Sequence, residues 1–199
     1  MQQLSLFKKV DAPPVQYIPS FLSKEQADLL LRHCLDLEWQ QNQIKMLGKL
    51  LQVPRLETIY GDEGCDYLYS NSVLLTPRPW TAPLDSLRQS IEHLSGYQFN
   101  IVIGNLYRDG RDSIGWHSDA EKSMGVKPAI ASLSLGAERK FQIRSNDKKH
   151  SYDFWLGHGS LLVMQPGCQS NWKHQVPKTS SLIGRRVNLT FRPHVKGIK

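Results

Sequence analysis

The 199-residue chain contains few cysteines and no long apolar run. Its three cysteines, Cys34, Cys65 and Cys168, lie far apart and form no CxxC pair. This usage argues against a disulfide framework or a zinc ribbon and is typical of a reducing compartment. No stretch approaches the roughly 20 apolar residues of a membrane span, so we expect no membrane partner. The first residues also lack the apolar core of a signal peptide, so we expect a cytoplasmic protein, or a nuclear one in a eukaryote.

Acidic side chains are scarce in the last third of the chain. Residues 121–199 carry 14 basic and 4 acidic side chains, whereas residues 61–120 carry 4 basic and 8 acidic ones. A local excess of positive charge favours a polyanionic partner such as nucleic acid, because phosphate neutralisation drives binding regardless of sequence. At least two of these arginines could instead serve a small acid.

The length predicts one domain over residues 1–199 with a sizeable core. Capping residues and apolar residues at helical spacing predict helices over 24–38 and 81–95. From residue 97 to residue 193 the pattern changes to short β runs separated by turn residues. This predicts a mainly β fold with flanking helices, an antiparallel sandwich or jelly roll with the helices on the outside of one sheet. The expected strands cover 99–106, 129–135, 140–144, 152–155, 160–164, 172–175 and 187–191.

The segment before this β region is less regular. Residues 1–40 are expected to form an arm followed by the first helix. Residues 41–80 are rich in Gly, Pro and Tyr, with short strands expected near 56–60 and 67–75. An irregular segment of this length in a small domain usually has a function or is disordered, and its aromatic residues argue against disorder.

Three residues form a candidate metal site: His117 and Asp119, in a His-Ser-Asp motif, and His174. Alternate residues of a strand share a face, so His117 and Asp119 could bind one ion. Two imidazoles and one carboxylate are the set that leaves positions of Fe(II) open for a co-substrate and O₂. The motif alone is a weak signal, but the ordered series His, Asp, His, Arg, Arg is a stronger one.

The two arginines of that series could bind a dicarboxylic acid. Arg186 and Arg192 lie six residues apart on one expected strand, so they share a face and can pair with both ends of a diacid. Asn105 and Tyr107, two residues apart, can donate hydrogen bonds to its carboxylates. The alternative for Arg186 is a surface contact with phosphate, beside Arg185.

From Asn105 onward the sequence resembles the AlkB family of Fe(II)- and 2-oxoglutarate-dependent dioxygenases. The resemblance rests on NLYRDG at 105–110, IGWHSDAE at 114–121, IASLSLG at 130–136, HGSLL at 158–162, WKH at 172–174 and RVNLTFR at 186–192. Matches at 54–55, 60–62 and 77–80 extend it over roughly residues 45–193, nearest to the branch that repairs nucleic acids.

This resemblance implies a double-stranded β-helix (jelly-roll) core over 97–193 and a nucleotide-recognition lid over 41–80. It implies Fe(II) on His117, Asp119 and His174. It also implies 2-oxoglutarate on five residues: Asn105, Tyr107, Arg186, Asn188 and Arg192.

The implied reaction couples decarboxylation of 2-oxoglutarate, with O₂, to hydroxylation of a methyl group on a base nitrogen. The methyl group would belong to 1-methyladenine or 3-methylcytosine and would leave as formaldehyde. The implied partner is methylated DNA, single- or double-stranded, or RNA, and we expect a monomer.

Candidate substrate contacts come from the lid and from the metal segment. Tyr69 could stack on a flipped base against the ring of His117, with Tyr67 nearby; the alternative is that both tyrosines pack on a sheet. Glu121 lies two residues after Asp119 and should face the pocket, where its carboxylate could accept from the exocyclic amine of the base. The alternative is a solvated surface glutamate.

Two further lid residues could contact nucleic acid. Leu47 beside Gly48 could wedge into a duplex, although buried packing is an equal alternative. Some relatives carry an aromatic residue there, and a leucine fills less of the gap left by a flipped base. We therefore expect single strands to be repaired at least as well as duplexes. Arg55 is one of the basic residues of this region that could contact the substrate.

Other functions are open on the sequence alone. The same oxygenase chemistry could act on RNA, a protein side chain or a small molecule, although the basic residues and aromatic lid disfavour a small molecule. A non-catalytic basic β domain that binds nucleic acid would have dispensable metal positions. A zinc hydrolase is disfavoured, because a third neutral ligand or a glutamate base is missing.

Overall fold

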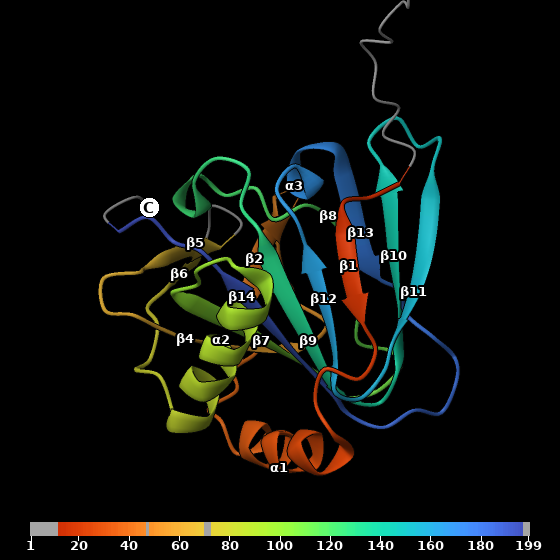
Figure 1. Ribbon diagram of the computed structural model, residues 1–199. Helices are drawn as coiled ribbons and strands as arrows, with labels where there is room; N and C mark the ends of the chain where they lie inside the picture. Colours follow the sequence, from red (N-terminus) through yellow and green to blue (C-terminus); the bar gives the residue numbers. More distant parts are fainter. Residues whose placement is uncertain (1–11, 47, 70–72, 197–199) are drawn as a thin grey trace, which may run out of the picture.

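The structure is a computed structural model that describes residues 12–46, 48–69 and 73–196 (Figure 1). Its helices are α1 (Lys24–Leu35), α2 (Ala82–Ser95), the short α3 (Cys168–Asn171) and a 3-10 turn at Lys122–Met124. Its strands are β1 (Val15–Ile18), β2 (Gln43–Met46), β3 (Lys49–Gln52), β4 (Leu56–Gly61), β5 (Tyr67–Tyr69), β6 (Val73–Leu75), β7 (Ile101–Tyr107), β8 (Ile114–His117), β9 (Ile130–Gly136), β10 (Arg139–Ser145), β11 (Ser151–Leu156), β12 (Ser160–Met164), β13 (Trp172–Val176) and β14 (Arg186–Arg192).

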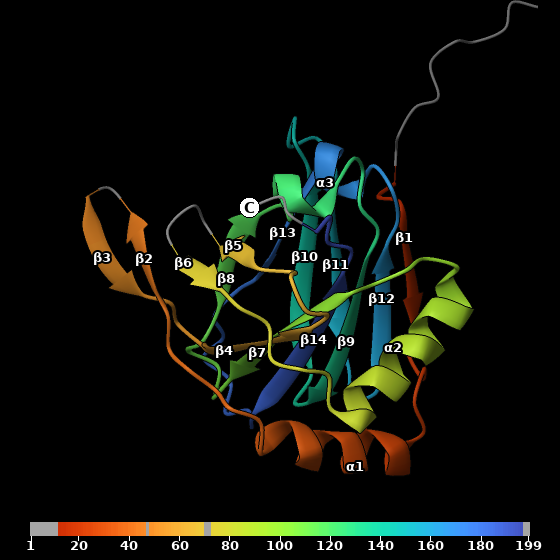
Figure 2. The same ribbon diagram turned by 90° about the vertical axis from the view of Figure 1, so that its left-hand side faces the viewer.

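Two antiparallel sheets form the body of the molecule. The larger has the order β1-β12-β9-β14-β7-β4, and the smaller has the order β11-β10-β13-β8. Two hairpins, β2–β3 and β5–β6, project on the side away from α2 (Figure 2). The expected jelly roll with flanking helices is confirmed.

The two long helices begin and end where the sequence predicts caps. The Ser23 side chain accepts from the Gln26 amide and the Gln26 side chain accepts from the Ser23 amide, which completes a capping box. Helix α2 starts after Thr81 and ends at Gly96, whose φ of 74° lies in the left-handed region that glycine tolerates. Helix α1 ends at Leu35, three residues earlier than predicted.

Both helices cover the outer face of the larger sheet. Their buried faces, with Ala27, Leu30, Leu84 and Ile91, join one apolar cluster with the strands of that sheet. A second cluster lies between the two sheets and includes Ile143, Trp172 and Val176. Cys34, Cys65 and Cys168 are all free and buried, consistent with the expected lack of a disulfide framework.

Strand β14 separates these two environments. All seven of its residues are buried. Val187, Leu189 and Phe191 join the cluster beneath the helices, whereas Arg186, Asn188, Thr190 and Arg192 line a cavity between the sheets. The period of two along one strand therefore supplies core on one side and a polar wall on the other.

The expected strands of the β region are observed within two residues at each end. Strands β1, β2, β3 and β8 were not predicted; each has only four residues, and β8 includes Gly115. Among the residues that the structure describes, no helix combines the length and apolar character needed to cross a membrane.

Candidate metal and co-substrate site

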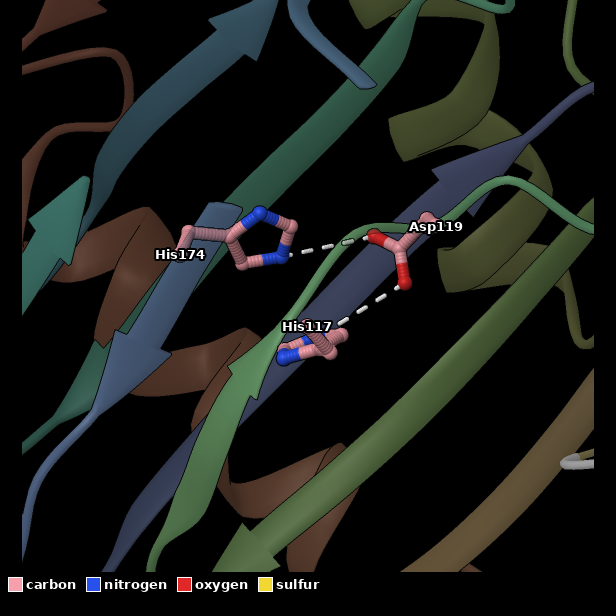
Figure 3. Close-up of side chains that lie close together, drawn as sticks. All are labelled: His117, Asp119 and His174. Carbon is pink, nitrogen blue, oxygen red and sulfur yellow. Dashed lines mark ion pairs between the residues drawn. The ribbon is translucent and has the colours of Figure 1, made fainter. Parts of the chain in front are cut away.

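The three candidate metal ligands meet beside strands β13 and β8, at one edge of the smaller sheet (Figure 3). His117 ends β8, His174 lies on the neighbouring β13, and the two residues are register partners. Asp119 lies two residues beyond the end of β8, so the loop that follows the strand, and not the expected alternation along a strand, places its carboxylate beside His117. One ligand atom from each residue lies within 4.8 Å of the others. The Asp119 oxygens lie 3.6 Å from Nε2 of each imidazole.

The charges of the site suit a divalent cation. Burial tends to raise the pKa of Asp119, but the Arg192 guanidinium and the two imidazoles together hold it below its ordinary value. Arg192 Nη2 lies 3.1 Å from Asp119 Oδ1. Burial, followed by the charge of His174, lowers the pKa of His117 to about 4, so its imidazole is neutral near pH 7. The Asp119 carboxylate and the neutral His117 imidazole are therefore available to a metal, with the His174 imidazole beside them.

The contacts around these ligands fix their orientation. His117 Nδ1 lies 2.8 Å from the Gly115 carbonyl oxygen. A proton on Nδ1 donated to that oxygen leaves the Nε2 lone pair directed at the metal position, as metal-binding histidines require. The Asp119 amide donates to Gln169 Oε1 at 2.9 Å, and Gln169 is itself buried. Gln169 precedes β13 by three residues, so it links the segments that carry Asp119 and His174.

A cavity of about 450 Å³ adjoins the three ligands. Arg186 is 1% exposed at its wall, and burial lowers its pKa to about 10, which leaves it charged at neutral pH. Its Nη2 donates to Ser134 Oγ at 2.8 Å. Its Nε and Nη1 have no hydrogen-bond partner among the described residues. A buried cation with two idle donors fits a carboxylate, because an unpaired buried charge is costly.

The other predicted co-substrate residues surround Arg186. Tyr107 and Asn105 on β7 are the register partners of Arg186 and Asn188 on β14. The Arg186 guanidinium lies 5.1 Å from the Tyr107 ring centre. Asn188 donates to Ser132 Oγ and to the Leu133 carbonyl oxygen, so its amide is held by neighbouring strand β9. This wall fits a dicarboxylate such as 2-oxoglutarate, and the three ligands beside it fit Fe(II).

The comparison with known proteins agrees with this geometry. Residues 14–192 match the model of the 2OG-Fe(II) oxygenase superfamily. Alpha-ketoglutarate-dependent dioxygenase alkB homolog 3 of Rattus norvegicus is 40% identical over 87% of this chain, and that of Homo sapiens is 39% identical over the same share. DNA oxidative demethylase ALKBH2 of Mus musculus is 38% identical over 75% of the chain. The chain belongs to the AlkB family of 2OG-Fe(II) oxygenases.

The chain spans 62% and 64% of the length of the two alkB homolog 3 relatives and 65% of mouse ALKBH2. A solved structure of OsALKBH1 superposes with a TM-score of 0.64 at 15% identity, covering 92% of this chain and 98% of that chain. This likeness supports the fold. Fe(II), 2-oxoglutarate and O₂ are the cofactor and co-substrates of the AlkB family, and the donor set described above suits them.

Two of the predicted substrate contacts, Glu121 and Tyr67, lie next to each other in this AlkB-family site, and the pKa of Tyr67 is raised by its burial and by the Glu121 carboxylate. Glu121 lines the cavity, and its Oε2 is buried without a hydrogen-bond partner among the described residues. Tyr67 is fully buried and its hydroxyl accepts from Arg192 Nη1 at 2.6 Å. The structure therefore brings Tyr67 to Arg192, and a contact with a base stays a prediction. Leu47 and the side chain of Tyr69 lie outside the described residues.

Arg55 lines the cavity from the end near β4. It is 3% exposed, its Nη2 lies 2.6 Å from Glu57 Oε1, and its Nε donates to Asn105 Oδ1 at 2.7 Å. This contact occupies the Asn105 oxygen and leaves the amide nitrogen to donate into the cavity. A contact between Arg55 and substrate stays a prediction.

Three residues of the site were not anticipated from the sequence. Gln169 accepts a hydrogen bond from the Asp119 amide, and Glu57 pairs with Arg55. Met164 lines the cavity and accepts a hydrogen bond from Gln169 Nε2 at 3.3 Å. Gln169 and Asp119 are 50 residues apart, so no local spacing connects them. The one available signal is a polar glutamine three residues before the strand that carries His174.

Proposed function

We propose that this chain demethylates N-alkylated bases, 1-methyladenine and 3-methylcytosine, in DNA. The proposal rests on one juxtaposition: the His117–Asp119–His174 ligand set, the buried Arg186 and the Glu121 carboxylate all line the same cavity. The names of two relatives, alkB homolog 3 and the DNA oxidative demethylase ALKBH2, support the same activity.

When bound, Fe(II) with 2-oxoglutarate and O₂ supplies the oxidation of a C–H bond while the diacid becomes succinate and CO₂. The residues of the chain bind and orient the reactants. Arg186, Tyr107 and the Asn105 amide nitrogen hold the diacid by charge-assisted and neutral hydrogen bonds. His117, Asp119 and His174 hold the iron beside it.

The methylated base would be oriented by Glu121. Its buried Oε2 can accept a hydrogen bond from the exocyclic amine that both lesions share. This places the N-methyl group toward the ligand set, where one oxygen atom from O₂ converts N–CH₃ to N–CH₂OH. The hydroxymethyl group then leaves as formaldehyde: its C–N bonding pair returns to the ring nitrogen and its hydroxyl proton passes to solvent, which restores the base. We also propose that residues 41–80 form the lid over this base.

The test is turnover of an oligonucleotide with a single 1-methyladenine, with formaldehyde and succinate measured together. One formaldehyde is expected for each coupled succinate. Glu121→Ala should slow demethylation by roughly 10- to 100-fold, the cost of one hydrogen bond to a charged group. It should leave substrate-free decarboxylation of 2-oxoglutarate unchanged. A matched RNA oligonucleotide and an acidic control variant on the surface, Glu25→Ala, complete the set.

Two results would contradict the proposal. Absence of methyl removal from every methylated oligonucleotide, with active decarboxylation, would favour a protein side chain as the substrate. An equal loss of both activities in Glu121→Ala would instead place Glu121 in support of the metal segment.

A further inference from the structure

The basic excess of the last third of the chain is only partly used by the cavity. Arg186 and Arg192 line it, but Lys140, Arg144 and Lys173 belong to the other face of the smaller sheet. His174 and Phe141 point into the cavity, and alternation along β10 and β13 directs these three cations outward. Arg144 and Lys173 are register partners, so two cations lie side by side in the middle of this outer face.

Two tryptophans lie on the same outer face, each with a cation over its ring. Trp155 on the edge strand β11 is 56% exposed, with Lys140 Nζ 5.2 Å from its ring centre. Trp116 on the opposite edge strand β8 has the Arg144 guanidinium 4.0 Å from its ring centre. Their strands are three strand spacings, about 14 Å, apart, and the two rings are also offset along the strands, so a few nucleotides would separate bases stacked on them.

The negative charge on this face is already compensated. The Asp153 carboxylate lies 2.9 Å from Lys140 Nζ and accepts a second hydrogen bond from Gln142. Among the described residues, neither Arg144 nor Lys173 forms an ion pair with a carboxylate. The outer face therefore presents aromatic rings and uncompensated cations, the two features that bind unpaired strands of nucleic acid.

Trp116 also connects this face to the active cavity. It lines the cavity together with its neighbours His117 and Ser118, at the free edge of the smaller sheet. A strand lying across β11, β10 and β13 would therefore reach the mouth of the cavity when it passes the edge of β8.

We propose that the outer face of β11-β10-β13-β8 binds single-stranded DNA that flanks the target nucleotide. Bases stack on Trp155 and Trp116, and phosphates contact Arg144 and Lys173. This surface is separate from the cavity that would hold the methylated base. The inference rests on the proposed function and extends it to the DNA on either side of that base. An acidic peptide would pair with the cations, but its carboxylate side chains would not stack on the two tryptophan rings as bases do.

The binding test uses an unmodified 20-nucleotide oligothymidine, followed by fluorescence anisotropy, on the full chain. Trp155→Ala should weaken binding roughly 5- to 100-fold, because one base–aromatic stack is lost. Lys173→Gln should weaken binding and reduce the slope of log affinity against log salt by about 0.7, because one phosphate contact is lost. The matched control is Lys24→Gln, a 78% exposed lysine on α1, the helix that packs on the larger sheet; this variant should bind as wild type does.

Two further measurements distinguish DNA binding by this outer face from effects on folding and on the active cavity. Trp155→Phe should retain most of the affinity, since a smaller aromatic ring still stacks. Turnover of a methylated trinucleotide, which is too short to cross the sheet, should be unchanged in Trp155→Ala. Because the binding arm needs no turnover, failure of demethylation would refute the proposed function and leave this surface standing.

Three results would contradict the proposed binding of DNA to this outer face. Wild-type affinity of the Trp155→Ala, Lys173→Gln double variant for the oligothymidine would do so directly. An equal loss in Trp155→Phe and Trp155→Ala would assign Trp155 a packing role. Stronger competition by a polyglutamate peptide than by unlabelled oligothymidine would assign the face to a protein partner.

Discussion

The two faces of β14 differ completely in chemistry although both are buried. Toward the helices the strand presents Val187, Leu189 and Phe191, which pack into the main apolar cluster. Toward the smaller sheet it presents Arg186 and Arg192 among other polar side chains of the cavity wall. Burial of apolar surface stabilises the fold, whereas burial of a charge with idle donors costs stability. One face of the strand therefore serves folding, and the other is retained for ligands at the expense of stability.

The largest effect on the ligand side should come from a metal ligand. His117→Ala should abolish binding of Fe(II) and all turnover, because it removes one of three protein ligands. Its side chain is 29% exposed, so the fold should be retained. Metal binding can be measured by titration under anaerobic conditions, with circular dichroism as the check on folding. Succinate release at the wild-type rate would show that the metal lies elsewhere.

Arg186→Met should separate co-substrate binding from folding stability most clearly. It keeps the volume but removes the buried cation, so affinity for 2-oxoglutarate should fall by roughly 30-fold to several thousand-fold. The stability of the ligand-free protein should not decrease, because a costly buried charge is replaced by an apolar group. Calorimetric titration of 2-oxoglutarate and denaturant unfolding measure the two effects. Unchanged affinity at saturating Fe(II) would remove Arg186 from the co-substrate site.

Leu189→Ala is the converse on the other face. Leu189 is 1% exposed, and truncation of a buried leucine lowers the free energy of unfolding by about 2–5 kcal/mol. The affinity of the folded protein for 2-oxoglutarate should stay within a few-fold of wild type. Unfolding in urea gives the first quantity and calorimetry the second. If affinity fell as steeply as in Arg186→Met, the two faces would not be independent.

The smallest of these effects should come from Gln169→Leu. It removes the acceptor of the Asp119 amide, and loss of such an outer contact lowers metal affinity by roughly 10- to 100-fold. Gln89→Leu on the exposed side of α2 is the matched control. Competition with a fluorescent chelator measures the affinity for Mn²⁺ as a probe. Equal affinities in the two variants would reduce Gln169 to a packing role.

The same contrast explains what the sequence could reveal. Strand β14 was predicted to within one residue at each end because its period of two is complete and turn residues precede it. The same period correctly placed Arg186 and Arg192 on one face. Strand β8 was not predicted, since four residues with a glycine carry too little pattern, and Asp119 proved to lie beyond its end.

Contacts between distant segments were outside the reach of the sequence. The spacing of Tyr67 and Tyr69 indicated a shared strand face, but nothing in it indicated that the Tyr67 hydroxyl would meet Arg192, 125 residues away. The pairing of Arg55 with Glu57 and Asn105 likewise depends on how β4 pairs with β7. The candidate metal ligands and diacid residues were accessible because their residue types, their spacing and the resemblance to the AlkB family all pointed to them.

The alternation of apolar and polar side chains along β14 also disfavours a misregistered cavity wall. Its register with β7 places Arg186 opposite Tyr107 and Leu189 opposite Gly104. A slip of one residue would turn every side chain of the strand to the opposite face. The arginines would then enter the apolar cluster while leucine and phenylalanine entered the cavity, so the slipped form would lose core and ligand wall together. A chain that folds into the observed register therefore carries an assembled cavity wall, because the same register places both the apolar residues and the arginines.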